Sequence, residues 1–152
     1  MRLRRYTDYA LRVLLYLAER PDRLCSISEM ASAYAISKNH LMKVVHGLGK
    51  TGYLASARGR LGGLRLARPA AEINLGAVVR LVEGDFELAD CTTCVIAQRC
   101  GLQGALGEAS RAFLAVLDGY SLADLLKAGP GLIGVARPAA NGRAAAADHA
   151  AR

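Results

Sequence analysis

Two short helical patterns separated by only two residues constrain the fold of this chain more than any other feature. The first begins at Ser26, and Glu29 follows three residues later at the spacing of a helix capping box. The second begins at Ser37 and repeats apolar residues on one helix face. These apolar residues are Leu41, Val44, Val45 and Leu48. Two helices joined by a turn at residues 35–36 predict a helix-turn-helix.

The periodicity changes after the second of these helices. Residues 53–57 and 64–67 are short strand candidates, and the glycine-rich turn 58–63 between them contains two arginines. A further helix, capped by Thr7 and running to about Glu19, is expected ahead of the helix-turn-helix. A helix-turn-helix followed by a hairpin of this kind predicts a winged helix.

Two more helical regions follow the hairpin. Asn74 is the candidate cap of a helix that ends before Gly84, and Ser121 with Asp124 predicts a last short helix. Between them, apolar residues recur with alternating spacings of four and three. They are Leu102, Leu106, Ala109, Phe113 and Val116. Such a seam needs a partner helix, which a homodimer supplies most simply; the alternative is that the helix packs only on its own domain.

These patterns predict a mainly α fold: a winged helix-turn-helix DNA-binding domain with a small β-hairpin wing and a long dimerisation helix. We expect the winged helix over 1–84, a cysteine cluster loop over 85–101, and the dimerisation helix with a short C-terminal helix over 102–128. Residues 129–152 are rich in Ala, Gly, Pro and Arg without periodicity, which is typical of a disordered tail. No apolar stretch approaches the about 20 residues that cross a bilayer, and no signal peptide is recognisable, so a cytoplasmic protein is expected.

The charge is concentrated at one end of the chain. Residues 1–70 carry 13 Lys and Arg against 4 Asp and Glu, whereas 71–128 carry 4 against 8. The N-terminal half is therefore expected to face a polyanion such as double-stranded DNA. The candidate contacts are Ser37, Lys38, Asn39, His40 and Lys43 on the second helix of the motif and Arg58 and Arg60 on the wing. The alternative is an ordinary solvated helix face and an exposed turn.

Three cysteines, Cys91, Cys94 and Cys100, fall within ten residues. Three sulfurs this close together are explained better by a shared ligand than by packing in a core. An odd number of cysteines cannot pair fully in disulfides. As ligands, thiolates favour Zn, Fe-S centres or Cu(I). No fourth Cys or His stands nearby in the sequence, which favours an iron-sulfur cluster with either a weak oxygen ligand or an open iron. Cys25 stands apart and is expected to be a small buried residue. A zinc-stabilised binding module, and a thiol redox protein that uses Cys91 and Cys94 as a C-x-x-C pair, are the alternatives.

Residues from about 1 to 128 resemble the iron-sulfur winged-helix transcriptional regulators of the NsrR/IscR type. The similarity lies in YTDYALR at 6–12, SKNH at 37–40, RGRLGGLRL at 58–66, the cysteine segment, and LDGYSLADL at 117–125. Within the group, the chain looks most like the NsrR branch, whose members are repressors that respond to nitric oxide.

The resemblance implies roles for individual residues. The three clustered cysteines match the cluster cysteines of the group, and Asp8 matches the aspartate that serves as fourth ligand from the other subunit in NsrR-type 4Fe-4S proteins. IscR-type proteins use a histidine three residues beyond the last cysteine, where this chain has Gln103. The gap of two residues between Cys91 and Cys94 is shorter than the four or five expected in the group. The resemblance to the NsrR branch nevertheless favours a 4Fe-4S cluster over a 2Fe-2S cluster.

The resemblance thus implies a function that is not enzymatic. It implies a homodimeric repressor that binds a pseudo-palindromic operator while it holds an iron-sulfur cluster, and that releases DNA when nitric oxide attacks the cluster. An IscR-like iron-sulfur or redox-responsive transcription regulator is the alternative within the same group.

Overall fold

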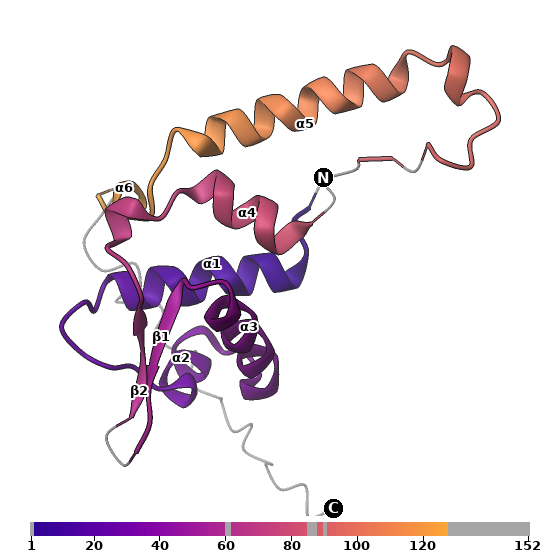
Figure 1. The fold of residues 1–152 in the computed structure, drawn as a ribbon. Helices are drawn as coiled ribbons and strands as arrows, with labels where there is room; N and C mark the ends of the chain where they lie inside the picture. The colour runs from indigo at the N-terminus through magenta and orange to yellow at the C-terminus, as the bar shows by residue number, and fades with distance from the viewer. Residues whose placement is uncertain (1, 60–61, 85–87, 90, 128–152) are drawn as a thin grey trace, which may run out of the picture.

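The computed structural model describes residues 2–59, 62–84, 88–89 and 91–127 of the 152-residue chain. The elements in chain order are α1 Arg5–Ala18, α2 Ile27–Tyr34, α3 Lys38–Lys50, β1 Leu54–Ala57, β2 Gly63–Leu66, the 3-10 turn η1 Ala70–Glu72, α4 Leu75–Glu83, the 3-10 turn η2 Ala97–Arg99, α5 Leu102–Asp118 and α6 Leu122–Leu126. The predicted fold class, mainly helical with one two-stranded hairpin, is confirmed (Figure 1). The predicted disordered tail, 129–152, lies outside the described residues.

Helix α1 is the centre of the core. Its apolar residues recur every three or four positions and form one wide face, on which Val13, Leu14 and Leu17 are at most 1% exposed. The helix contacts α3 and α4, and also meets α6 and β2. Burial of one such leucine side chain stabilises the fold by about 1.5–3 kcal/mol. The other elements of the winged helix are therefore positioned relative to α1, which lies between α4 and α3 in Figure 1.

The helix-turn-helix forms as the sequence predicts. The Ser26 side chain accepts a hydrogen bond from the Glu29 backbone N–H at 3.1 Å and caps α2. Ala35 then takes a left-handed conformation with φ of 52°. The next residue, Ile36, is buried and its N–H donates to the Ala31 carbonyl at 3.0 Å. This turn redirects the chain into α3 within a few residues.

The wing is an antiparallel hairpin in which Leu54 pairs with Leu66 and Ala57 pairs with Gly63. Leu54 and Leu64 turn toward the core. A bridge between Cys25 and Leu64 fastens the segment before α2 to the hairpin. Cys25 is wholly buried, as predicted, and burial raises the pKa of its thiol.

The predicted cap at Thr7 is wrong. Helix α1 begins two residues earlier, at Arg5, and the Thr7 side chain is wholly buried inside the helix. Its hydroxyl donates to a carboxylate oxygen of Glu83, the last residue of α4. A hydroxyl buried between two helices needs a partner, and the distant carboxylate provides one.

The caps predicted further along the chain do form. Asn74 accepts a hydrogen bond from the Ala77 N–H at 2.9 Å, and Ser121 with Asp124 makes a complete capping box. Asn74 also donates through its amide to the Asp118 carbonyl at 2.7 Å. This last bond joins the start of α4 to the end of α5.

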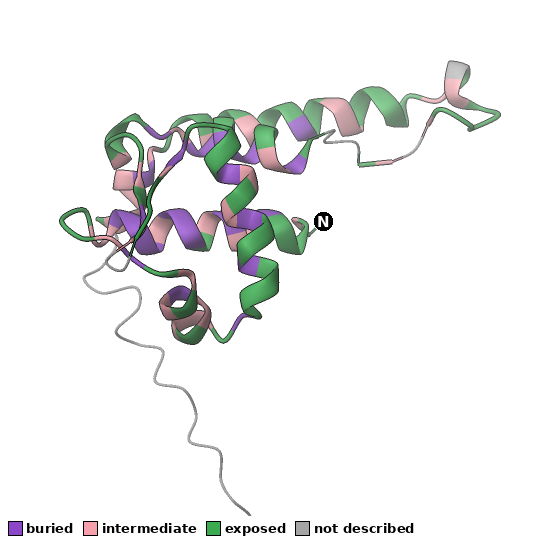
Figure 2. Cartoon of the chain, turned by 60° about the horizontal axis from the view of Figure 1, so that its bottom comes forward, coloured by how far each residue is buried: buried purple, intermediate pink, exposed green. Residues whose placement is uncertain are grey.

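Helix α5 packs on α4 along one side only. Leu106 and Phe113 are partly covered, whereas Leu102 and Val116 remain 55% and 63% exposed. Figure 2 shows the contrast between the buried α1 and the mostly exposed α5. The predicted apolar seam is therefore divided between a side that packs within the chain and a side that does not.

Candidate DNA interface and candidate metal centre

The polar residues predicted to contact DNA lie at the start of α3. Ser37, Lys38, Asn39, His40 and Lys43 are all exposed, while Leu41 and Val44 of the same helix are buried. The core thus holds α3 by its apolar stripe and leaves the other face open. A helix presented in this way can enter a major groove with its N-terminal residues closest to the bases.

The wing lies beside this helix. Arg58 is exposed at the end of β1, next to Gly59, whose φ of 106° suits glycine. Arg60 lies outside the described residues. In Figure 1 the hairpin extends past α2 on the same side of the molecule as α3. A cationic side chain at this tip can approach phosphates or a minor groove.

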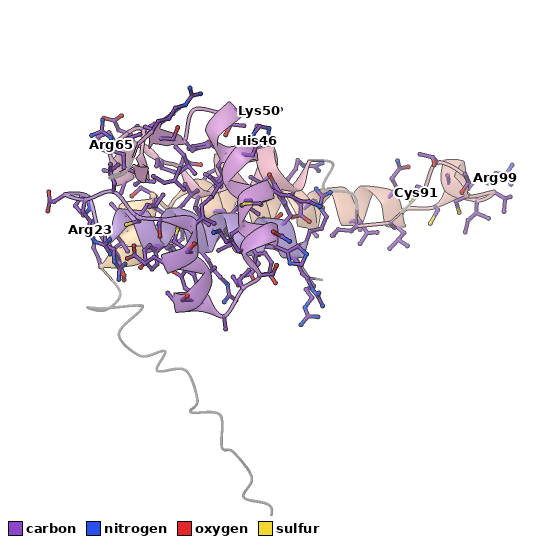
Figure 3. The ribbon with its side chains drawn as sticks, turned by 90° about the horizontal axis from the view of Figure 1, so that it is seen from below. Arg23, His46, Lys50, Arg65, Cys91 and Arg99 are labelled. Atoms are coloured by element: carbon purple, nitrogen blue, oxygen red, sulfur yellow. The ribbon has the colours of Figure 1, made fainter. Side chains whose placement is uncertain are left out.

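Basic side chains that the sequence analysis did not select lie further along α3 and on the wing. Lys50 and His46 are exposed on α3, and Arg65 is exposed on β2 (Figure 3). Arg65 follows the buried Leu64, so strand alternation places it on the outer face. That alternation was the available signal for Arg65, because the strand itself was predicted.

One nearby cation is instead engaged in structure. Arg23 forms an ion pair with Glu29, which also accepts a hydrogen bond from the Tyr16 hydroxyl at 2.6 Å. The Arg23 hydrogen bond, with help from Tyr16, lowers the pKa of the Glu29 carboxyl to about 2. Arg23 therefore ties the loop before α2 to α2, while the Tyr16 hydrogen bond to the same carboxylate joins α1 to α2.

The three clustered cysteines are free thiols. Cys91 and Cys100 are half-buried and Cys94 is exposed. Successive turns connect them, because the Cys94 N–H donates to the Cys91 carbonyl and the Cys100 N–H donates to the Ala97 carbonyl, both at 3.4 Å. Figure 3 places Cys91 and Arg99 far from α3, beyond the end of α5.

These cysteines suit a thiophilic metal centre by their chemistry. They are three accessible sulfurs without a disulfide, in one short segment. Among the described residues of a single chain, no group of three or more His, Cys, Asp or Glu side chains is gathered closely enough to hold a metal ion. The three sulfur donors are present, and the described residues do not gather them with a further ligand.

A hollow of about 330 Å³ adjoins Cys91 and is lined by Gln103, Leu106 and Ser110 of α5. Gln103 occupies the position where IscR-type proteins carry a histidine ligand. An amide is a poor ligand for soft metal centres, so this side chain does not extend the thiolate set.

Asp8 lies in the first turn of α1 and is half-exposed. Its Oδ1 accepts a hydrogen bond from the Arg12 Nε at 2.9 Å, and this bond raises the pKa of the Arg12 guanidinium. The structure does not bring Asp8 together with the cysteines of the same chain. Asp8 belongs to α1, whereas the cysteine segment directly precedes α5, whose N-terminal end lies away from α1 in Figure 1.

Glu83 is a site residue that the sequence analysis missed. It is only 9% exposed and accepts hydrogen bonds from the Thr7 hydroxyl and, at 3.2 Å, from the Arg4 backbone N–H. The Arg4 guanidinium pairs with the same carboxylate at 3.3 Å. Glu83 thus fastens the end of α4, from which the chain continues to the cysteines, to the first turn of α1. No local pattern marks a glutamate at a helix end for burial.

The second helix of the helix-turn-helix has an exposed polar face, and a wing flanks it. The cysteines lie on a separate arm, which comprises the described residues from Leu88 to Asp118. Together these features define a winged-helix DNA-binding regulator. The chain belongs to the Rrf2 family: residues 3–128 match its family model, described as "Iron-dependent Transcriptional regulator". None of the helices in the described part of the chain is long and apolar enough to span a membrane.

Relatives of known name support the same assignment. The chain is 52% identical over 133 residues to the HTH-type transcriptional regulator NsrR of Bacillus subtilis (strain 168), covering 84% of this chain and 91% of that protein. It is 50% identical over 133 residues to NsrR of Geobacillus kaustophilus (strain HTA426), covering 84% and 90%. The expected resemblance to the NsrR branch is confirmed, and the chain is a transcriptional regulator rather than an enzyme.

Solved structures show the same fold. The structure titled T. potens IscR matches with a TM-score of 0.70 at 24% identity, over 84% of this chain and 88% of that one. Staphylococcus aureus CymR matches with a TM-score of 0.64 at 28% identity, over 79% and 93%. The winged-helix assignment therefore agrees with experimentally determined relatives.

Proposed function

We propose that this chain is a cytoplasmic, homodimeric repressor that binds a pseudo-palindromic operator while it holds an iron-sulfur cluster. It releases the operator DNA in response to nitric oxide. The observation that carries the proposal is the placement of three free cysteines on an arm that is separate from the DNA-facing helix. Such separation suits a sensor, because a ligand at one site can change the affinity of the other. The identity of about half of the residues with NsrR proteins supports the same assignment.

The ligands we propose are Cys91, Cys94 and Cys100, with Asp8 of the other subunit as the fourth. The short segment supplies sulfur donors, and the distance of Asp8 from the cysteines of its own chain agrees with a ligand that crosses between subunits. A cluster of the 4Fe-4S type, favoured over 2Fe-2S, would supply when bound the iron with which nitric oxide reacts. A bridge of this kind would tie the arm of one subunit to α1 of the other.

The proposed homodimer interface is the uncovered side of α5. Small or apolar residues follow one another along this side at helical spacing. They are Leu102, Ala105, Ala109, Ala112 and Val116, and all are exposed. Small side chains let a second helix approach closely, and a contiguous apolar surface is the usual mark of an interface. Two winged helices related by a two-fold axis then fit two half-sites of an operator.

DNA contact is proposed for two groups of side chains. Ser37, Lys38, Asn39 and His40 would lie nearest the base edges, where Asn39 can pair with adenine, and Lys43 would lie nearer phosphate. Arg58 and Arg60 would reach the backbone or the minor groove from the wing. A change of about 3 kcal/mol in operator affinity on cluster loss would weaken binding more than a hundredfold.

The decisive experiment uses protein purified without oxygen. Iron and sulfide analysis, the visible spectrum and native mass spectrometry identify the cluster, and operator affinity is then measured at fixed salt before and after nitric oxide. We expect Cys94→Ser to lose iron and Cys25→Ser, the matched control, to retain it. Equal operator affinity of the cluster-bearing and cluster-free proteins would refute the proposal, and a zinc-only preparation would identify a structural metal instead.

A further inference from the structure

We propose that Tyr9 is a positioning residue for DNA recognition: its ring holds His40 in place at the DNA-facing start of α3. This inference rests on the proposed use of that helix to contact DNA. It assigns a role to a residue of α1 that does not itself belong to the recognition helix.

The observation is a contact between two rings from different helices. The centroids of the Tyr9 and His40 rings are 6.2 Å apart, and their planes are inclined at 40°. Aromatic pairs attract at centroid separations of about 4.5–7 Å. Tyr9 comes from the second turn of α1 and His40 from the first turn of α3, so the contact joins the two helices.

The two rings differ in how firmly they are held. Tyr9 is partly buried and packs against the hydrophobic core, whereas His40 is exposed. The tyrosine ring is therefore an anchored surface, and the imidazole lies against it with its remaining edges open to solvent. An imidazole supported on one face keeps its nitrogen atoms available to a base edge or a phosphate.

A second contact fixes α3 relative to the same end of α1. The Tyr6 hydroxyl lies directly against the backbone of Gly47, where a Cβ atom would collide with it. Tyr6 and Tyr9 thus touch α3 at two points about two turns apart. Two such points resist rotation of α3 about its axis, which keeps His40 beside the Tyr9 ring.

The physical benefit is preorganisation. A free side chain loses rotamer freedom when it binds, which weakens binding by about three- to tenfold for each side chain immobilised. His40 has part of this freedom removed beforehand by Tyr9. Without the tyrosine ring, His40 would be just as able to form its contact but would lose more freedom in forming it.

A double-mutant cycle tests this coupling in the full chain. The probe is the duplex that the wild type selects from a pool of randomised DNA, with affinities measured at one salt concentration. We expect Tyr9→Leu to weaken binding about two- to fivefold, which is part of the cost of immobilising one side chain, and His40→Ala to weaken it at least as much. The double variant should bind no more weakly than His40→Ala, and Tyr9→Phe should bind like the wild type, because it keeps the ring.

The outcomes separate this inference from the proposed function. If Tyr9→Leu weakens binding by the same factor with and without His40, Tyr9 supports only the fold and the inference is wrong. It is also wrong if Tyr9→Leu leaves the affinity unchanged. If the wild type selects no preferred duplex, the proposed function falls as well. Should Tyr9→Leu fail to fold, as judged by circular dichroism, the same cycle is run with Tyr9→Met, which keeps a long apolar side chain.

Discussion

Two regions of this molecule use apolar residues in opposite ways. The body, defined as residues 2–84 with α6, buries them, and Leu14 has no exposed surface. The arm, defined as the described residues from Leu88 to Asp118, displays them, and Val95 is fully exposed. The body completes its core within one chain. The arm carries apolar residues that the described part of the chain leaves uncovered.

The largest expected effect contrasts a leucine from each region. Leu14→Ala should lower the free energy of unfolding by about 2–5 kcal/mol, because it leaves a cavity in the core. Leu102→Ala removes the same atoms from an exposed position and should change it by about 0.5 kcal/mol or less in the monomer. Urea titrations followed by circular dichroism over a range of protein concentrations measure both. Equal losses at all concentrations would abolish the distinction between body and arm.

The next effect concerns glycine at the joint between the regions. A Cβ atom at Gly76 would lie 3.0 Å from the Asp118 backbone nitrogen, so Gly76→Ala should destabilise the protein by about 1–3 kcal/mol. Gly104, on the arm, has nothing within 4 Å of the same position. Gly104→Ala should therefore stabilise by up to about 1 kcal/mol, since alanine favours a helix. Thermal unfolding of the two variants should show shifts of opposite sign.

The proposed dimer offers a third contrast, within the arm alone. Val116→Glu places a charge on the uncovered apolar side of α5 and should weaken dimerisation at least tenfold, which is about 1.4 kcal/mol. Ala115→Glu adds the same charge one residue away, on an exposed part of the helix facing elsewhere. Sedimentation velocity at several concentrations measures both. A loss of dimer in both variants, or in neither, would argue against this surface as the interface.

The smallest effect concerns pH and the body. The pKa of Glu29 is about 2 in the folded protein against an ordinary value of 4.5. Its ion pair therefore stabilises the fold above pH 4.5, and this contribution is lost as the pH falls from 4.5 toward 2. Glu29→Gln should destabilise by less than about 1 kcal/mol at pH 7, because the pair is partly solvated. Urea titrations should show this difference at pH 7 and a much smaller one near pH 2, where about half of the Glu29 carboxyl is protonated; an undiminished difference there would exclude the charge as its cause.

How well the sequence predicts a contact in this protein depends on how far apart the two residues are along the chain. The caps at Ser26, Asn74 and Ser121 were predictable, because each binds a backbone group three residues away. The Thr7 hydroxyl binds Glu83, which is 76 residues away, and no local pattern announces such a partner. The same limit hid the contact between Tyr9 and His40.

The candidate site divides in the same way. The open face of α3 followed from its apolar stripe, because a helix buries one side and exposes the other. The three cysteines were visible by spacing alone, but spacing does not say whether their sulfurs meet at one ligand, and the described residues do not gather them. Asp8 was selected as a candidate ligand because of a family resemblance and not because of its surroundings. In this chain its carboxylate forms an ion pair with Arg12.

The C-terminal end of helix α5 is held to the body by polar contacts, so the displacement caused by any tilt of the helix about that end is largest at its N-terminal end. Its last residue, Asp118, is held by Arg80 and by Asn74, while the cysteines lie beyond its opposite end. Seventeen helical residues span about 25 Å. A tilt of about 10° at the fastened end would therefore carry the sulfurs through about 4 Å, by simple geometry on that length. Small adjustments beside Asp118 would thus be amplified at the tip, far from where they begin.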